Sequence, residues 1–214
     1  MLNFEELFNE TKIIAILRGI PSDKLIPTLD ALYEGGVRLA EITYDNTDTV
    51  PDEGTASDIG RAVMHTEGRM LIGAGTVLRQ NQVTMTAAVG GRFIISPDTN
   101  PAIIEATKNA GLLSLPGAMT VTEVCSAVAA GADYVKLFPV NVLGPSFVKA
   151  ILAPLRNAKL IAVGGITPEN IPEYLKAGCI GFGIGTNIAN SKLASEGKFD
   201  VIAENARKFI EACK

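Results

Sequence analysis

Short apolar runs alternate along the chain with longer segments of helical character. Because parallel strands are joined by crossover helices, this alternation predicts an α/β protein. Eight such runs occur, and each is interpreted as a strand. The expected strands cover residues 13–17, 38–44, 70–74, 92–96, 112–115, 133–138, 159–163 and 180–184.

Capping signals indicate where several helices begin and end. A capping residue precedes a proline at Asn100-Pro101, Gly144-Pro145 and Thr167-Pro168, and proline is favoured at the first helical position. The segment Thr120-Val121-Thr122-Glu123 matches a capping box. Glycines after small residues, as in Asn109-Ala110-Gly111, are typical of helix ends. The repeating unit is therefore strand, loop, helix and glycine.

Eight strand–helix units within 214 residues predict a compact (β/α)8 TIM barrel. An additional helix at residues 3–10 could close the bottom of the barrel. The main alternative is an open, doubly wound sheet, which would carry a glycine-rich dinucleotide loop after its first strand. Here that strand continues into Leu17-Arg18-Gly19-Ile20-Pro21, so the barrel is favoured. No shift in composition marks a linker, and residues 1–214 are expected to form a single domain.

Charge and cysteine content narrow the functional classes. The chain has 19 basic and 23 acidic residues without long blocks of either sign, so nucleic acid is not expected as a partner. Its three cysteines, Cys125, Cys179 and Cys213, are widely spaced and are expected to be reduced thiols. An acidic N-terminus and the lack of a membrane-length apolar run argue against a signal peptide or a membrane partner. We therefore expect a soluble cytoplasmic protein.

Lys136 is the most informative residue, because it lies in an otherwise apolar strand, Ala132–Pro139. A buried lysine loses hydration, which lowers its pKa and favours the neutral amine that can attack a carbonyl. Alternatively, its stem is buried while the ammonium reaches solvent or pairs with a carboxylate. Lys136 is thus a candidate Schiff-base nucleophile, with a structural role as the alternative.

The carboxyl ends of barrel strands face one mouth, so polar residues there can act together despite their separation in sequence. In the strand that contains Glu41, alternation places Leu39, Glu41 and Thr43 on one face. If this face points inward, Glu41 can meet Lys136, either as an ion pair or as an acid/base partner of a nucleophile. The polar residues at these strand ends are Arg18, Glu41, Thr43, Thr76, Ser96 and Lys136.

Two glycine pairs follow the seventh and eighth expected strands, in Val163-Gly164-Gly165-Ile166 and Gly183-Ile184-Gly185-Thr186. Barrels often bind phosphate between these two loops, because glycine lets backbone N–H groups approach an anion. Tight turns alone would also explain the glycines. The only histidine, His65, falls in an expected surface helix, which argues against a histidine-dependent triad. No acidic cluster has metal-ligand spacing, and no metal or cofactor is expected.

The chain resembles the class I aldolase family that includes 2-keto-3-deoxy-6-phosphogluconate (KDPG) aldolase and 4-hydroxy-2-oxoglutarate (KHG) aldolase. The resemblance covers nearly the whole chain and depends on the order and spacing of its motifs. They are Ile14-Ala15-Ile16-Leu17-Arg18, Glu41-Ile42-Thr43, Gly73-Ala74-Gly75-Thr76-Val77, Ile95-Ser96-Pro97, Leu115-Pro116-Gly117, Val135-Lys136-Leu137-Phe138-Pro139, Gly164-Gly165-Ile166-Thr167-Pro168-Glu169-Asn170 and Gly183-Ile184-Gly185-Thr186.

This resemblance implies a retro-aldol cleavage of KDPG to pyruvate and glyceraldehyde 3-phosphate, with some activity on 4-hydroxy-2-oxoglutarate. Lys136 would form the imine and Glu41 would carry protons. The partners would be a phosphorylated 2-keto acid and pyruvate, with no cofactor or metal, and the enzyme would be a homotrimer. The implied substrate-binding residues are Arg18 and Thr76 for the carboxylate, Pro97 and Phe138 around the imine, and Gly164, Gly165, Gly185 and Thr186 for the phosphate.

The chain departs from the family pattern at two positions. Asp45 stands where some members have an arginine, so Arg18 would hold the carboxylate alone, and Val163 replaces a frequent threonine. The segments Leu17–Ile20 and Ala162–Gly165 also resemble 2-keto-3-deoxy-6-phosphogalactonate aldolases, which act on the C4 epimer. A phosphosugar isomerase or epimerase on the same barrel and a non-catalytic phosphate-binding protein are two further interpretations of the sequence.

Overall fold

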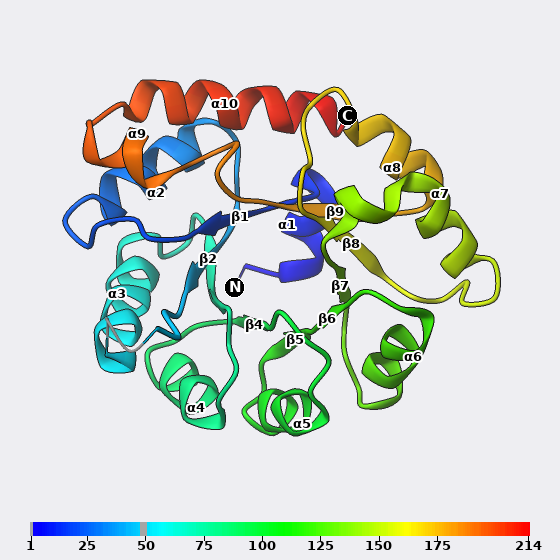
Figure 1. Ribbon diagram of the computed structural model, residues 1–214. Coiled ribbons are helices and arrows are strands. Elements are labelled where there is room, and N and C mark those ends of the chain that lie inside the picture. Colours follow the sequence, from blue (N-terminus) through cyan, green and yellow to red (C-terminus); the bar gives the residue numbers. More distant parts are fainter. Residues whose placement is uncertain (1, 48–50) are drawn as a thin grey trace.

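The computed structural model describes residues 2–47 and 51–214, and its centre is a barrel of parallel strands surrounded by helices (Figure 1). The sheet order is β5-β4-β3-β2-β1-β9-β8-β7-β6. The strands are β1 (Ile13–Leu17), β2 (Leu39–Thr43), β3 (Leu71–Gly75), β4 (Phe93–Ile95), β5 (Leu113–Leu115), β6 (Gly117–Ala118), β7 (Val135–Leu137), β8 (Leu160–Val163) and β9 (Gly181–Ile184). This arrangement confirms the TIM-barrel prediction.

The ring closes through a break just after the fifth expected strand, which covered residues 112–115. β5 pairs with β4, whereas β6, just after Pro116, pairs with β7. Proline has no N–H to donate to a ladder, and its carbonyl instead accepts the N–H of Lys136 at 2.9 Å. Within the described residues, a ninth strand, β6, is therefore added to the eight expected ones, because the chain changes neighbours at Pro116.

Helices follow the strands and form the outer layer of the barrel (Figure 1). Asn100 caps α5 by accepting the N–H of Ala102, and Thr120 and Glu123 form the expected capping box of α6. The helices are α1 (Phe4–Thr11), α2 (Leu25–Glu34), α3 (Asp52–His65), α4 (Gln80–Ala88), α5 (Pro101–Asn109), α6 (Val121–Ala129), α7 (Val140–Leu152), α8 (Ile171–Ala177), α9 (Ser191–Ser195) and α10 (Phe199–Ala212).

Two of the expected helix starts differ in detail. Gly144, with a φ of 74°, interrupts α7, so Pro145 begins the second part of that helix rather than a separate one. The helix expected at Thr167-Pro168 begins only at Ile171. Its start is delayed because the Asn170 side chain accepts the Thr167 N–H at 3.0 Å and holds the preceding residues in a turn.

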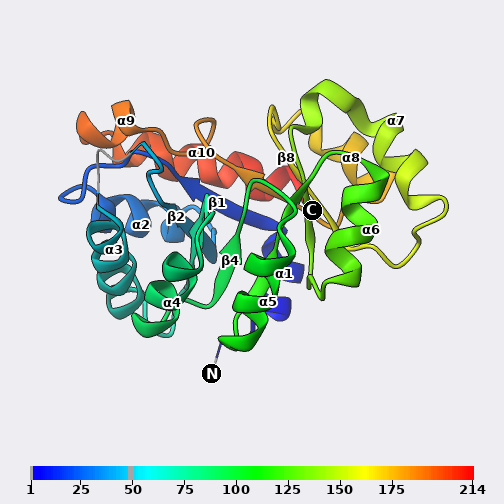
Figure 2. The ribbon, with the colours of Figure 1, turned by 60° about the horizontal axis from the view of Figure 1, so that its bottom comes forward.

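Apolar side chains form one core inside the barrel and another between strands and helices. The inner core includes Ile14, Leu39 and Ile161, whereas their strand neighbours belong to the outer core. The expected N-terminal helix, α1, adds Phe4 and Phe8 to the inner core and lies across one end of the barrel (Figure 2). The other end is thereby left open for the polar residues at the strand ends.

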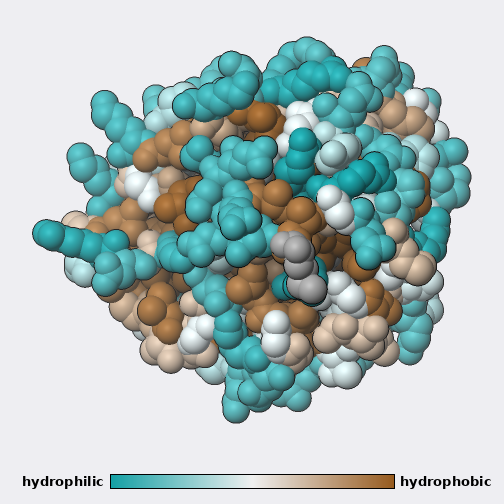
Figure 3. All heavy atoms as spheres, turned by 180° about the vertical axis from the view of Figure 1, so that it is seen from behind, coloured by the Kyte–Doolittle hydropathy of each residue, from teal (hydrophilic) through white to brown (hydrophobic). Residues whose placement is uncertain are grey.

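The surface on the side opposite to the view of Figure 1 carries apolar residues near its middle, among more numerous polar ones (Figure 3).

Within the described part of the chain, none of the helices combines the length and the apolar character required to cross a membrane.

Candidate active site

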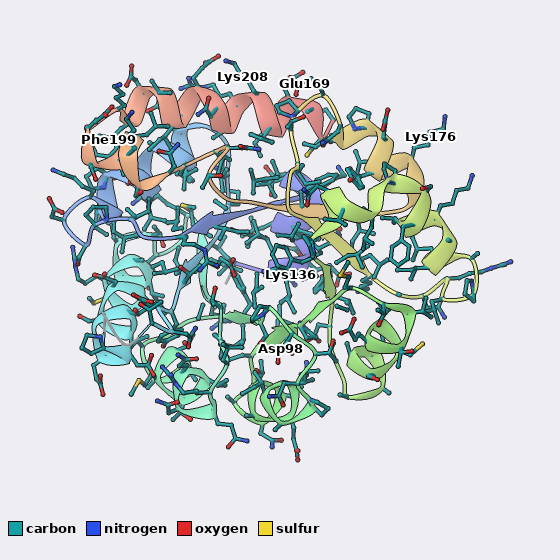
Figure 4. The ribbon with its side chains drawn as sticks, in the orientation of Figure 1. Asp98, Lys136, Glu169, Lys176, Phe199 and Lys208 are labelled. Carbon is teal, nitrogen blue, oxygen red and sulfur yellow. The ribbon has the colours of Figure 1, made fainter. Side chains whose placement is uncertain are left out.

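Lys136 projects into the barrel from β7. Its neighbours Val135 and Leu137 belong to the outer core, so alternation directs the lysine inward, and its label lies near the middle of the ring in Figure 4. The side chain is buried, with its Nζ 5.0 Å from the centre of the Phe138 ring. Burial lowers the pKa of Lys136, whereas the negative charge of Glu41 opposes this shift and Arg18 adds to it. The lysine environment therefore favours the neutral amine.

Glu41 lies on the inner face of β2 and is fully buried. Within the described residues, neither of its carboxyl oxygens has a hydrogen-bond partner. Burial raises the pKa of Glu41, and the positive charges of Lys136 and Arg18 only partly oppose this effect. A buried carboxyl group without fixed hydrogen bonds beside a buried amine is suited to exchange protons with a bound molecule.

Arg18 and Thr76 are joined at the rim of the barrel. The Nη2 group of Arg18 donates to the Thr76 hydroxyl at 2.7 Å, although β1 and β3 are separated by β2. Thr76 has a φ of 56°, in the left-handed region that few residues other than glycine adopt. The pair therefore presents a guanidinium and a hydroxyl to the barrel mouth, a combination suited to a carboxylate.

One cavity of about 360 Å³ connects these groups with the glycine loops. All the predicted site residues except Glu41 line it, and Glu41 is buried close by. The predicted residues along its wall are Arg18, Thr76, Pro97, Lys136, Phe138, Gly164, Gly165, Gly185 and Thr186. The structure thus brings together residues from six strand ends that are distant in the sequence.

The two glycines after β8 both have left-handed backbone conformations. Gly164 and Gly165 have φ values of 103° and 68°, and a Cβ on Gly165 would lie 2.6 Å from the Cβ of Asn141. After β9, the N–H groups of Ile188 and Ala189 both donate to the Gly185 carbonyl, which forms a single helical turn. The backbone of these glycine loops therefore forms part of the cavity wall, to which Arg18 and Lys136 also contribute.

Asn187, which the sequence did not single out, also lines the cavity. Its amide donates to the Ile166 carbonyl at 2.8 Å and so joins the two glycine loops. A single asparagine in a polar loop gives no distinctive signal, although its position directly after Gly185-Thr186 could have drawn attention to it. Val163, noted as a departure from the family pattern, lines the same cavity.

Two of the expected strand-end residues lie apart from this cavity. Thr43 donates to the Leu17 carbonyl at 3.3 Å and lines a neighbouring cavity together with Asp45. Ser96 is buried and does not line the cavity that contains Lys136. Arg18 lines both cavities, so it is the link between them.

Other chemical centres are not supported within residues 2–47 and 51–214. No three histidine, cysteine or acidic side chains in these ranges come together in an arrangement that could hold a metal ion. His65 lies on α3 and contacts Asp30 at 2.8 Å, at the surface of the protein. The barrel mouth is therefore the candidate active site.

A family model described as KDPG and KHG aldolase matches residues 4–205 of this chain. The chain belongs to the KDPG and KHG aldolase family. Aldolases are lyases, so family membership identifies this protein as an aldolase rather than as a phosphosugar isomerase or epimerase.

Individual relatives agree with this assignment. The aldolase is 39% identical over 180 residues to the probable 2-dehydro-3-deoxy-6-phosphogalactonate aldolase of Rhizobium meliloti, with 84% of this chain and 82% of the relative covered. It is 33% identical to the 2-dehydro-3-deoxy-6-phosphogalactonate aldolase of Escherichia coli, with 94% and 93% covered. The prefix 2-dehydro has the same meaning as 2-keto.

A solved structure shares both the fold and the family. KDPG aldolase from Legionella pneumophila, crystallised with pyruvate captured as a covalent carbinolamine, matches with a TM-score of 0.83 at 25% identity. The match covers 94% of this chain and 95% of the Legionella chain.

Proposed function

We propose that this aldolase cleaves a 2-keto-3-deoxy-6-phospho sugar acid through a Schiff base at Lys136. The observation that carries the proposal is the burial of Lys136 beside Glu41, together with its place in the wall of a cavity that the glycine loops also line. The neutral amine attacks the C2 ketone and a C–N bond forms. The former carbonyl oxygen takes up one proton from the amine and one from the carboxyl group of Glu41 and leaves as water, so Glu41 becomes a carboxylate. The resulting protonated imine attracts electrons from the rest of the substrate.

Glu41 carries the protons of this reaction. Its carboxylate removes the proton of the C4 hydroxyl, the C3–C4 bond breaks, and the bonding electrons move to the imine to give an enamine. Glyceraldehyde 3-phosphate leaves as the aldehyde. The enamine is then protonated at C3, and water hydrolyses the imine to release pyruvate and regenerate the Lys136 amine, so the cycle is balanced without a cofactor.

The two ends of the cavity suit the two ends of such a substrate. Arg18 and Thr76 bind the carboxylate next to the ketone, and Pro97 and Phe138 enclose the imine. The phosphate binds to the backbone N–H groups and hydroxyl around Gly164, Gly165, Gly185 and Thr186. This assignment places the reacting carbons between Lys136 and the glycine loops.

The galactonate epimer is the preferred substrate within this proposal. The two relatives named as 2-dehydro-3-deoxy-6-phosphogalactonate aldolases are more similar to this chain, at 39% and 33% identity, than the Legionella KDPG aldolase, at 25%. Val163 supports the same choice, because it lines the cavity and belongs to the segment Ala162–Gly165 that resembles the phosphogalactonate aldolases, with no hydroxyl at this position. KDPG, which the sequence motifs suggested first, and 4-hydroxy-2-oxoglutarate are the weaker substrates.

Two measurements test this function. Incubation with pyruvate and borohydride, followed by peptide mapping, should place a reduced pyruvyl adduct on Lys136, and no adduct or an adduct elsewhere would contradict the mechanism. Steady-state cleavage of both C4 epimers, followed by pyruvate release, should give the higher kcat/KM for the galactonate. A higher kcat/KM for the gluconate would overturn the choice of epimer and leave the mechanism intact.

The expected homotrimer remains a prediction, which light scattering can check.

A further inference from the structure

Thr76 occupies a backbone conformation that requires support. Its φ of 56° lies in the left-handed region, where the Cβ of any residue other than glycine is crowded by the backbone. The same residue accepts the hydrogen bond from Arg18 and lines the cavity. The surrounding contacts therefore determine whether its hydroxyl faces Arg18.

Asn46 holds the carbonyl group of Thr76. In the loop after β2, the Nδ2 group of Asn46 donates to the Thr76 carbonyl at 2.9 Å. The other atom of this amide, Oδ1, accepts a hydrogen bond from the Nε2 group of Gln82 at 3.2 Å. Asn46 is half-buried and does not line the cavity, so it acts on the site through Thr76.

Gln82 anchors Asn46 from the first turn of α4. Gln82 is fully buried, and its Oε1 accepts the N–H groups of Leu78 and Arg79 at 2.9 and 3.1 Å. Its Nε2 donates to Asp52 at 2.9 Å as well as to Asn46. Both donors and both acceptor positions of the amide are therefore used, which fixes its orientation.

Asp52 completes the network at the start of α3. Its carboxylate accepts two hydrogen bonds at 2.9 Å from Arg79 and one at 3.1 Å from Asn81, in addition to the one from Gln82. A network in which each member has its partners is rigid. It links two helices and the loop after β2 to a single acceptor in the active site, the Thr76 carbonyl.

We propose that Asn46 and Gln82 are positioning residues that hold the Thr76–Arg18 pair in the geometry that binds the carboxylate of the keto acid. This inference rests on the proposed function, because it takes Thr76 and Arg18 as the carboxylate site. The network lies on the side of the barrel away from the glycine loops. It therefore sets the affinity for pyruvate without changing the affinity for the phosphorylated aldehyde.

The test compares Asn46→Ala with Asn81→Ala in the full-length enzyme. Both substitutions remove an amide from the same network, but only Asn46 contacts Thr76. Asn46→Ala should raise the pyruvate concentration for half-maximal borohydride trapping about five- to tenfold, the effect of one lost hydrogen bond. The KM for glyceraldehyde 3-phosphate in the synthetic direction should not change, and Asn81→Ala should leave both values unaltered.

The remaining outcomes separate the inference from the function on which it rests. Asn46→Ala could lower only the melting temperature, or raise the half-maximal pyruvate concentration and the KM for glyceraldehyde 3-phosphate together. In either case the network is merely structural and the inference is overturned. Equal effects of Asn46→Ala and Asn81→Ala on pyruvate would also overturn it. The proposed function itself fails if the wild-type enzyme, without any substitution, forms no adduct with pyruvate.

Discussion

Gly75 on β3 faces the carboxyl group of Glu41 on β2, and the space between them cannot hold a side chain. A Cβ on Gly75 would overlap Oε2 of Glu41 and lie 2.9 Å from Oε1. Real Cβ atoms do not approach other atoms so closely, and neither group lies on a flexible surface. The absence of a side chain at residue 75 therefore gives Glu41 its place in the barrel.

Replacement of this glycine should displace Glu41. Gly75→Ala is expected to reduce kcat at least tenfold, because the carboxylate can no longer reach the substrate, and to cost about 1–3 kcal/mol of stability from overpacking. Steady-state cleavage and thermal unfolding measure the two effects. Gly73→Ala is the matched control, since a Cβ there overlaps Phe93 and not Glu41. An active Gly75→Ala enzyme would show that Glu41 can shift without loss of function.

The charge of Glu41 should also control the ionisation of Lys136. Burial lowers the pKa of Lys136, and the Glu41 carboxylate opposes this shift. In Glu41→Gln the opposing charge is lost, so the pKa of Lys136 falls further and the neutral amine persists at lower pH. The acid limb of the pH profile for pyruvate trapping should therefore move to lower pH, while kcat for cleavage decreases.

The trapping rate at a series of pH values measures this effect. Glu105→Gln, which removes an exposed carboxylate from α5, should leave the profile unchanged. If the acid limb of the Glu41→Gln profile stays in place or moves to higher pH, Glu41 does not act on the charge of Lys136.

Much of this site follows from strand alternation alone. Lys136 and Glu41 point inward because their strand neighbours are apolar residues of the outer core, a pattern visible in the sequence. Strand alternation does not show which cavity a residue at a strand end lines: Thr43, placed by the same rule on one face with Glu41, donates to the Leu17 carbonyl and lines the neighbouring cavity.

Other features depend on contacts that have no sequence signature. The break just after the fifth strand, at Pro116, requires two different neighbours for adjacent residues, β4 on one side and β7 on the other. The support of Thr76 by Asn46 and Gln82 joins three separate segments. Such relationships appear only when the ring closes, because no local pattern encodes them.

The glycine loops should bind phosphate through their backbone conformation. In Gly165→Ala, a Cβ would be placed at a φ of 68° and only 2.6 Å from the Cβ of Asn141, so the loop must move. The KM for glyceraldehyde 3-phosphate in the synthetic direction should rise about tenfold or more, as expected from the loss of one or two hydrogen bonds to a charged group. Trapping of pyruvate at Lys136 should be unaffected.

Gly144→Ala is the control for backbone strain. Gly144 has a φ of 74° in α7, but its Cβ would meet nothing within 4 Å. This substitution should lower stability without a change in the KM for the aldehyde. If both alanine variants bind glyceraldehyde 3-phosphate as the wild type does, the phosphate lies elsewhere in the cavity.

Val163 should influence which C4 epimer is cleaved. It lies on the inner face of β8, is 6% exposed, and lines the same cavity as Lys136. Val163→Thr exchanges a methyl group for a hydroxyl of similar size, which can bond to the C4 hydroxyl in one orientation and not in the other. The kcat/KM ratio of gluconate to galactonate should increase, by about tenfold, since a single polar contact discriminates on this scale.

Both epimers must be assayed with the same enzyme, so that a general loss of activity cancels in the ratio. Val142→Thr makes the same chemical change on the surface of α7, where the side chain is 68% exposed, and should leave the ratio unaltered. Because both epimers yield pyruvate and glyceraldehyde 3-phosphate, the synthetic direction offers a second readout, the C4 configuration of the product. An unchanged product in Val163→Thr would assign stereochemical control to the placement of the aldehyde by the glycine loops rather than to the wall formed by β8.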